Sequence, residues 1–408
     1  MREVSVLVIG GGPAGLTAAS DLASSGHDVL VLEREATAGG IPRHCDHSGF
    51  GLSDLRRLTT GPAYAHLLVN QARASGAQIQ TATMVTDWID DHTVLATSPQ
   101  GRERIRADAI VLATGARERP RSARLIPGDR VAGVFTTGQL QQLVHLQHRP
   151  IGKVAVVIGS ELVSWSAVMT LRSAGVRTAL VTTTDPRPDF PSTLGRWGLR
   201  APTAASTRVT RIIGAAGRVS AVEIENVTTG EQRTIACDTV ITTADWVPDH
   251  ELARTAGLAM DPGSRGPVVD QVLRTSRPGV FAAGNLVHPV VTAGAAAQSG
   301  RHVANGVRRW LDQPTPAPTG APLLVEAPLR WATPQVLHGG ESAARGRLLV
   351  WLDAHVGRAT FEATQGDRLL GRHRLRLPAG PGRAVSLPES LVAGFDQAGP
   401  PVILAARF

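Results

Sequence analysis

Apolar residues near the start of the chain come in short, uninterrupted runs. Residues 4–9, apolar except for Ser5, form one such run. A glycine-rich stretch follows at 10–15, a helical pattern extends to about residue 25, and a second apolar run ends at Glu33. Continuous apolar runs of this length are typical of strands that are buried on both faces. A strand, a helix and a second strand in this order predict a βαβ unit with a parallel sheet.

The same pattern recurs further along the chain. The apolar run 154–158 leads into Gly159, a helical stretch to about residue 174, and another apolar run at 178–182. The sequence therefore predicts an α/β fold with two Rossmann-like dinucleotide-binding domains, the second inserted in the first. We expect the first domain at 1–115 and 263–312 and the inserted one at 116–262.

The pattern of residue types changes after these two domains. Residues 313–322 are rich in proline, which favours neither a helix nor a central strand, so this segment is expected to be a linker. From 323 to 408 the apolar runs are short, partly alternating and bounded by Gly or Pro. That pattern predicts a small antiparallel β domain at the end of the chain.

Composition narrows the class of protein. The formal charge is +8, but the arginines are scattered among acidic residues and form no stripe, so no nucleic-acid partner is expected. No apolar run reaches the roughly 20 residues of a membrane span. A strand that begins almost at Met1 leaves no room for a signal peptide, so we expect a cytoplasmic protein. The two cysteines are too few for a disulfide framework or an iron–sulfur cluster, and no metal site is expected.

The glycine-rich stretch fits the pattern G-x-G-x-x-G. Gly10 allows a tight turn, Gly12 lets a pyrophosphate approach the backbone, and Gly15 lets the helix pack on the strand. The free N–H groups at the start of the helix then face the phosphates. Glu33 ends the second strand, where a carboxylate accepts hydrogen bonds from ribose hydroxyls.

Two further segments decide which dinucleotide is bound. Residues 275–285 resemble the T-S-x-P-G-V-F-A-A-G-D motif of the two-dinucleotide-domain flavoproteins, and 111–116 resemble the A-T-G crossover of the same proteins, the pyridine nucleotide-disulfide oxidoreductase superfamily. This resemblance implies FAD, with the last motif residue at the ribityl chain. Here that residue is Asn285 rather than Asp, and an amide still bonds hydroxyls. The candidate FAD contacts are Gly10, Gly12, Pro13, Ala14, Gly15, Glu33, Arg34, Gly40, Ile41, Val85, Ala113, Thr114, Gly115, Gly284 and Asn285.

The turn of the inserted domain departs from the pattern. It begins with Gly159 and has the small Ser164 in the third position, but its middle position is Glu161. A carboxylate there takes space that a pyrophosphate needs and repels its charge, so this site is expected to be degenerate. The alternative is that Glu161 turns aside and NAD(P)H still binds.

The loop after Gly40 holds the candidate catalytic residues. Disulfide reductases carry two redox cysteines in this region, whereas this chain has Cys45 alone, either as a redox thiol or as a buried packing residue. His44 and His47 are candidates for proton transfer or for holding the loop. His288, after the second flavin motif, can stabilise reduced flavin, orient substrate or simply start a helix. With no fourth ligand in view, the loop is not expected to bind a metal.

A closer resemblance rests on the loop 39–52 and on 60–65. These stretches look like the flavoproteins associated with glycerol-3-phosphate dehydrogenase and like the α subunits of sarcosine oxidase, opine dehydrogenase and hydrogen cyanide synthase. The resemblance implies an FAD-dependent dehydrogenase, or a subunit of one, that acts on a C–N or C–O bond of a small molecule. It also implies a possible partner, either a second flavoprotein or an iron–sulfur subunit. Two other hypotheses are a NAD(P)H-dependent reductase that uses Cys45 and a non-catalytic flavin-bearing subunit.

Overall fold

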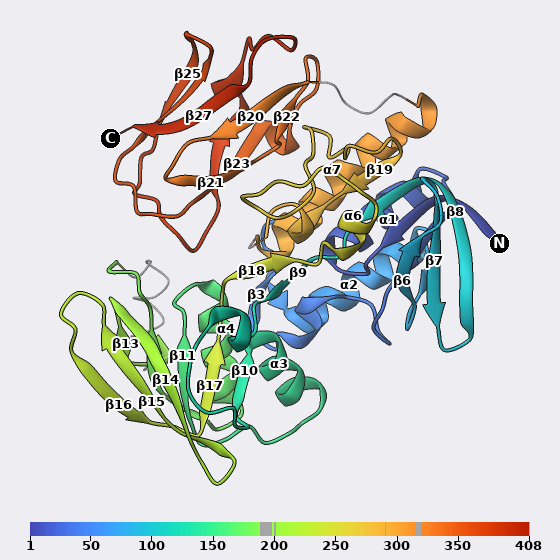
Figure 1. The fold of residues 1–408 in the computed structure, drawn as a ribbon. Helices are drawn as coiled ribbons and strands as arrows, with labels where there is room; N and C mark the ends of the chain where they lie inside the picture. The colour runs from blue at the N-terminus through green and yellow to red at the C-terminus, as the bar shows by residue number, and fades with distance from the viewer. Residues whose placement is uncertain (188–197, 200, 290, 315–319, 408) are drawn as a thin grey trace.

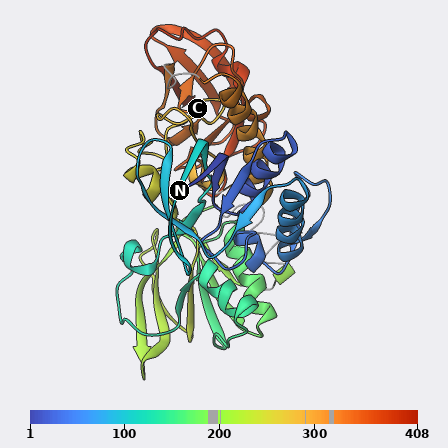
Figure 2. The ribbon, with the colours of Figure 1, turned by 90° about the vertical axis from the view of Figure 1, so that its right-hand side faces the viewer.

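The chain folds into three bodies, which Figures 1 and 2 show from two directions. The computed structural model describes residues 1–187, 198–199, 201–289, 291–314 and 320–407. In both views the body drawn mainly in blue and cyan lies between a green body and the orange-red C-terminal body. No helix among the described residues is long and apolar enough to cross a bilayer.

A mixed sheet forms the centre of the first body. Its order is β5-β2-β1-β8-β7-β6, and β19 pairs with the carboxyl half of β8. The strands are β1 (Arg2–Ile9), β2 (Val29–Leu32), β5 (Gln78–Gln80), β6 (Met84–Trp88), β7 (Thr93–Ser98), β8 (Gly101–Leu112) and β19 (Val280–Ala282). Strands β5, β2, β1, β8 and β19 run parallel, and β6 and β7 form an antiparallel hairpin. The predicted parallel βαβ arrangement is confirmed.

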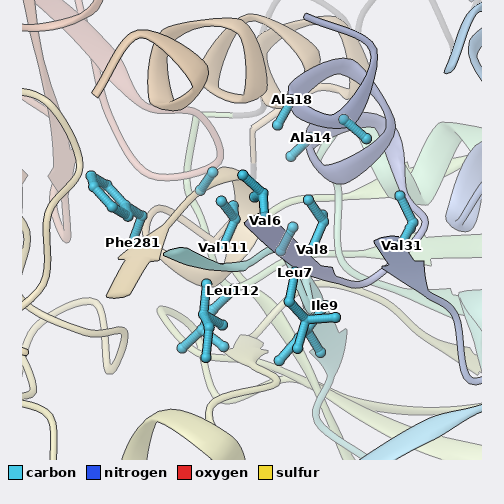
Figure 3. Packing of buried hydrophobic residues seen from close by; sticks show 14 of the residues in the cluster. Val6, Leu7, Val8, Ile9, Ala14, Ala18, Val31, Val111, Leu112 and Phe281 are labelled. Atoms are coloured by element: carbon cyan, nitrogen blue, oxygen red, sulfur yellow. The ribbon is translucent and has the colours of Figure 1, made fainter. Parts of the chain in front are cut away.

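Both faces of this sheet are covered. In Figure 3, Val6 and Val8 of β1 point towards the helix α1 (Pro13–Ser24), and Leu7 and Ile9 point to the opposite side. All four side chains are buried, which explains why the run along β1 is uninterrupted rather than alternating. Helix α7 (Ala293–Asp312) packs so closely on α1 that a Cβ on Gly300 would lie only 2.1 Å from the carbonyl oxygen of Ala14.

Short elements complete the first body around these helices. They are η1 (Ile41–His44), β3 (Ser48–Phe50), β4 (Thr59–Thr60), α2 (Gly61–Ala74), α6 (Glu251–Thr255) and the 3₁₀ turn η4 (Gly284–Leu286). The first segment of the chain and the segment after residue 250 thus share one core, as predicted for a domain that is interrupted by an insertion.

The inserted body repeats the parallel arrangement. Its main sheet has the order β10-β17-β11-β12-β13, and all its pairs are parallel. An antiparallel sheet, β14-β15-β16, packs beside it. The elements are η2 (Arg121–Arg124), β10 (Val134–Thr136), α3 (Thr137–Gln141), the π-helix η3 (Gln142–Leu146), β11 (Val154–Ile158), α4 (Leu162–Ser173), β12 (Arg177–Thr182), β13 (Thr203–Ala204), β14 (Thr207–Ala215), β15 (Arg218–Asn226), β16 (Gln232–Ala236) and β17 (Thr239–Thr242).

The chain passes between these two bodies through a single ribbon. Strands β9 (Ala116–Glu118) and β18 (Trp246–Pro248) pair antiparallel, with Val247 opposite Arg117. In Figure 1 this ribbon lies at the junction of the blue and green bodies.

The C-terminal body consists of two packed sheets around its own core. Their orders are β22-β20-β27-β24-β25 and β21-β23-β26, and the pair β20–β27 is parallel while the others are antiparallel. The elements are β20 (Ala321–Val325), β21 (Leu329–Thr333), β22 (Val336–Leu337), η5 (Ala344–Gly346), β23 (Arg347–Leu352), β24 (Thr360–Gln365), β25 (Arg368–Arg374), β26 (Val385–Pro388), η6 (Glu389–Val392) and β27 (Val402–Arg407). The first strand starts inside the expected linker 313–322, of which residues 315–319 lie outside the described residues.

Candidate functional site

Two glycines of the turn between β1 and α1 leave no room for a side chain. Gly10 has a φ of +110°, and a Cβ on it would lie 2.4 Å from the carbonyl oxygen of Ala113. A Cβ on Gly15 would lie 2.0 Å from the oxygen of Gly10. Gly12 differs, because a Cβ there would meet only Gly40, at 4.0 Å. Gly12 is also the N-cap of α1, and no side chain caps this helix, so the space before its first N–H groups is open.

Glu33 supports this turn from the end of β2. Its carboxylate is buried and accepts hydrogen bonds from the backbone N–H of Gly11 and of Glu35, both at 2.8 Å. Each oxygen retains a lone pair that can accept from a ribose hydroxyl. Val85 lies nearby on the edge strand β6, because the N–H of Thr83 bonds to the carbonyl of Glu33 at 2.9 Å.

Residues from the second flavin motif lie beside the turn. A Cβ on Gly284 would be 2.8 Å from that of Ala14, so η4 packs directly on the start of α1, next to Pro13. Asn285 follows, and its amide makes two hydrogen bonds to one residue: Val291 N–H donates to Oδ1 at 2.9 Å, and Nδ2 donates to the Val291 carbonyl at 3.3 Å. One donor hydrogen and one lone pair remain for a ligand.

Asp249, which follows β18, is hydrogen-bonded to the A-T-G crossover that precedes β9. The Thr114 hydroxyl donates to the Asp249 carbonyl at 2.7 Å, and the Asp249 N–H donates to Gly115 at 2.9 Å. The buried Asp249 carboxylate also pairs with Arg34 at 3.0 Å and with Arg117 at 2.9 Å. Asp249 therefore fixes two candidate FAD contacts, Arg34 and Thr114, which the sequence alone did not connect with it.

The loop 39–45 lies against the glycine turn. Gly40 has a φ of +62°, and a Cβ on it would be 2.9 Å from the Cα of Gly12. Ile41, the next candidate contact, begins η1 and is half exposed. His44 is buried at the end of η1, with its Nε2 at 3.2 Å from Arg43 and at 3.8 Å from the Glu35 carboxylate. Interaction with His44, and then the charge of Arg43, lowers the pKa of Glu35.

Cys45 is a buried thiol that faces acceptors. Its Sγ lies 3.3 Å from Oε1 of Gln141 in α3 and 3.5 Å from the carbonyl of Ile41. Burial raises the pKa of Cys45 to about 12. The other cysteine, Cys237, is buried in a core of the inserted body, and burial raises its pKa to about 11. Cys45 is therefore a neutral thiol at physiological pH.

His47 is connected to Cys45 by hydrogen bonds through Gln141 and Ser166. Nε2 of Gln141 donates to the Ser166 hydroxyl of α4 at 2.8 Å, and His47 Nε2 lies 2.7 Å from that hydroxyl. His47 Nδ1 lies 2.8 Å from the carbonyl of Ser48, so Nδ1 donates there, and in a neutral ring Nε2 accepts from Ser166. In this series of hydrogen bonds each group donates to the next, from Cys45 through Gln141 and Ser166 to His47. The series joins the flavin-side loop to the inserted body.

His288 lies apart from this network, in the segment between η4 and α7. Its ring is buried, its Nδ1 has no hydrogen-bond partner within the described residues, and burial lowers its pKa to about 4. The ring is neutral at physiological pH, so His288 can offer a hydrogen bond there but not a positive charge.

The structure therefore brings His44, Cys45 and His47 onto one loop and leaves His288 on another. Sequence reasoning missed Gln141 and Ser166, which connect Cys45 with His47. No local pattern marks them, because Gln141 lies 96 positions from Cys45 and Ser166 lies 119 positions from His47. Among the described residues no group of three or more His, Cys, Asp or Glu side chains is placed to hold a metal ion.

Two dinucleotide-type folds, with glycine-turn residues at the carboxyl edge of the first sheet, are typical of dinucleotide-binding proteins. The chain belongs to the pyridine nucleotide-disulphide oxidoreductase family, whose sequence profile matches residues 4–303. It is an FAD-dependent oxidoreductase. The open space at Gly12, the uncapped start of α1 and the buried Glu33 fit this cofactor.

Several characterised proteins are similar in sequence. An opine oxidase subunit of Agrobacterium tumefaciens (strain Ach5) is 30% identical over 346 residues, which cover 74% of this chain and 67% of that protein. The benzene 1,2-dioxygenase system ferredoxin–NAD(+) reductase subunit of Pseudomonas putida is 27% identical, with 69% and 66% covered. The alpha subunit of sarcosine oxidase from Corynebacterium sp. (strain P-1) is 27% identical, but the match spans only 32% of its length.

Solved structures share the fold. Thioredoxin reductase of T. acidophilum superposes with a TM-score of 0.64 at 22% identity, covering 75% of this chain and 98% of that one. L-proline dehydrogenase from P. horikoshii has a TM-score of 0.57 at 20% identity, covering 77% and 60%.

Proposed function

We propose that this flavoprotein is a dehydrogenase, or one component of a dehydrogenase, that removes a hydride from a C–N or C–O bond of a small metabolite. When bound, FAD supplies the hydride acceptor at flavin N5. The residues proposed to hold it are the turn glycines, Glu33 and Asn285, with Arg34, Gly40, Ile41, Val85 and the 113–115 crossover around them. Sequence relatives named for opine and sarcosine favour a C–N bond over a C–O bond.

The observation that carries this proposal is the state of Cys45. A thiol-based reductase needs an accessible thiolate, whereas Cys45 is buried, donates to Gln141 and has its pKa raised to about 12 by burial. The described part of the chain offers it no second cysteine, since Cys237 is buried in the core of the other body. Redox chemistry at this site is then assigned to the flavin alone.

The roles of the three histidines follow from their contacts. His47 keeps the loop against the inserted body through Ser166, and His44 holds Glu35 and Arg43 beside the glycine turn, so both are proposed as positioning residues. His288 has a buried ring nitrogen without a partner, and we propose that it gives a neutral hydrogen bond to the flavin or the substrate.

The competing proposal is a NAD(P)H-dependent reductase that passes electrons to a protein partner. The similarity to the ferredoxin–NAD(+) reductase subunit favours it. Related proteins are also named as subunits, so a second flavoprotein or an iron–sulfur protein is the proposed partner in either case.

An anaerobic titration of the purified yellow protein distinguishes the two. The donors are sarcosine and other secondary amino acids, a matched set of 2-hydroxy acids, NADH and NADPH, and the readout is the visible flavin absorbance. We expect at least one amine or hydroxy acid to bleach the flavin to completion. Bleaching by NADH or NADPH alone, with no response to any metabolite, would identify a reductase and reject the proposed function.

A further inference from the structure

The two glycine turns of this chain have the same backbone. Gly159 has a φ of +126° and donates to the last residue of β12 at 2.8 Å, as Gly10, with a φ of +110°, donates to the last residue of β2 at 2.9 Å. The N-cap of α4, Glu161, has φ −80° and ψ −179°, and the N-cap of α1, Gly12, has φ −85° and ψ −175°. The inserted body therefore retains the main-chain geometry of a dinucleotide site.

Three side chains fill this second turn. Where the first turn has Gly12, Gly15 and Ala113, the second has Glu161, Ser164 and Thr243, as the matching strand registers show. The Ser164 hydroxyl donates to Oε2 of Glu161 at 3.0 Å, and the Thr243 hydroxyl lies 3.3 Å from the same oxygen. Ser164 and Thr243 are 2.6 Å apart. The three polar groups thus bind one another at positions that are apolar and small in the FAD turn.

Glu161 lies at the position that corresponds to Gly12 in the FAD turn. Because the two backbones match, the Cβ of Glu161 stands where a Cβ on Gly12 would stand, in front of the first N–H groups of the helix. Its carboxyl group then turns onto Ser164 and Thr243 rather than into solvent. Burial raises the pKa of Glu161, and hydrogen bonds from Ser164 and Thr243 act in the opposite direction. Whether charged or neutral, the side chain leaves less room before the first turn of α4 than Gly12 leaves before α1.

The ribose end of the second turn is altered as well. In the first body Glu33 accepts from the N–H of Glu35, and at the equivalent place Thr183 accepts from the N–H of Asp185 at 3.1 Å. The carboxylate that holds a ribose is therefore replaced by a hydroxyl. Asp185 is itself bound by His355 of the C-terminal body, with Nε2 at 2.5 Å and 2.6 Å from its two oxygens. The C-terminal body thus contacts the edge of the inserted body where the adenosine half of a dinucleotide would lie.

We propose that Glu161, supported by Ser164 and Thr243, excludes nicotinamide dinucleotides from the inserted body and so determines which donor can reduce the flavin. This inference deepens the proposed function and rests on it for the identity of the donor. The C-terminal body acts in the same direction by holding Asp185 through His355.

The test is a direct binding measurement, independent of flavin chemistry. Isothermal titration of the holoenzyme with NADH, NADPH and ADP-ribose is compared between wild type, Glu161→Gly, the triple variant Glu161→Gly/Ser164→Gly/Thr243→Ala, and Glu231→Gly as a matched control on an exposed hairpin of the same body. NADPH is included because Arg187 is exposed near Asp185 and could bind a 2′-phosphate.

We expect wild type and the control to show no saturable binding up to about 1 mM, the upper end of usual KM values. The Glu161→Gly and triple variants should bind one nucleotide per chain at least about tenfold more tightly than wild type, with unchanged FAD content. Stoichiometric binding to wild type overturns the proposal. The proposal is also overturned if both variants fold, contain FAD and still bind no dinucleotide, because Glu161 is then not the excluding group.

The two proposals fail in different ways. If wild type binds a dinucleotide and a metabolite still bleaches the flavin, this inference falls and the proposed function stands. If wild type binds no dinucleotide and no metabolite bleaches the flavin, the exclusion stands and the proposed donor class falls.

Discussion

At the scale of single residues, Cys45 separates the functional hypotheses. Its thiol is the start of a hydrogen-bond chain that ends at His47, and each group in that chain has a fixed donor or acceptor role. Burial raises the pKa of Cys45 and outweighs the hydrogen bonds with Ser166 and Gln141, which lower it. The same side chain that a reductase would use for chemistry is here used to join two bodies.

Thiol reactivity gives the first prediction. With pKa values of about 12 and 11, the native chain should hold far less than a hundredth of Cys45 or Cys237 as thiolate at pH 8. We expect no thiol to react with Ellman's reagent in the native holoenzyme and both to react after unfolding. A Cys45→Ser variant keeps a donor to Gln141 and should reduce metabolite-dependent activity by less than about threefold. One rapidly labelled thiol per native chain, or complete loss of activity in the serine variant, contradicts this.

His288 gives a pH-dependent prediction. Burial lowers its pKa from 6.5 to about 4, so the unfolded state binds the proton more tightly than the folded state. The stability that this difference contributes is complete above pH 6.5 and is lost as the pH falls towards 4. At pH 5 the loss is about 2 kcal/mol.

Urea unfolding of wild type and His288→Asn at pH 8 and pH 5 measures this effect. Wild type should lose about 2 kcal/mol more than the variant between the two pH values, because the variant has no proton to take up. Equal losses in the two proteins would show that the folded ring takes up its proton as readily as the unfolded one, so that its pKa is not lowered.

At the scale of elements, the start of α7 depends on an amide. Asn285 both accepts from and donates to Val291, and the cap of the helix, Thr292, follows immediately. An aspartate, which the family motif has at this place, keeps the first bond and loses the second. Its carboxylate would also face the Val291 carbonyl. The departure from the motif is therefore explained by the segment that precedes α7.

This explanation predicts the effect of restoring the motif. Asn285→Asp should lower the free energy of unfolding by about 1–3 kcal/mol and weaken FAD binding, since it leaves a carbonyl unpaired next to a charge. Asn305→Asp, which adds the same charge on the exposed face of α7, serves as the control. Thermal unfolding and FAD titration of the apoprotein measure both effects. Tighter FAD binding in Asn285→Asp would show that the ribityl contact outweighs the Val291 contact.

At the scale of the whole molecule, the sequence predicted what local patterns determine. The glycine turn of β1 and α1, the two parallel βαβ units and the insertion follow from uninterrupted apolar runs and from Gly10 to Gly15, and the fold class is confirmed. The parallel pair β20–β27 was not predicted, because an alternating strand looks the same whichever way its neighbour runs.

Contacts between distant segments could not be predicted from the sequence, for a different reason. Glu161 was predicted to disturb the second turn, but its partner Thr243 lies 82 positions away, and no spacing rule connects them. The same holds for His355 and Asp185, which are 170 positions apart. Packing of complete bodies, rather than any local preference, brings these side chains together.

The β9–β18 ribbon limits how the inserted body can move. Both passages of the chain run through this one antiparallel pair, so we expect any rotation of the inserted body to centre on it. Gly115 and Asp249, at its flavin end, would be displaced least by such a rotation. Gln141 and Ser166, which contact the loop of Cys45 and His47, lie off the axis and would be displaced more. Motion of the inserted body would therefore leave the 113–115 crossover in place and act on the cysteine loop.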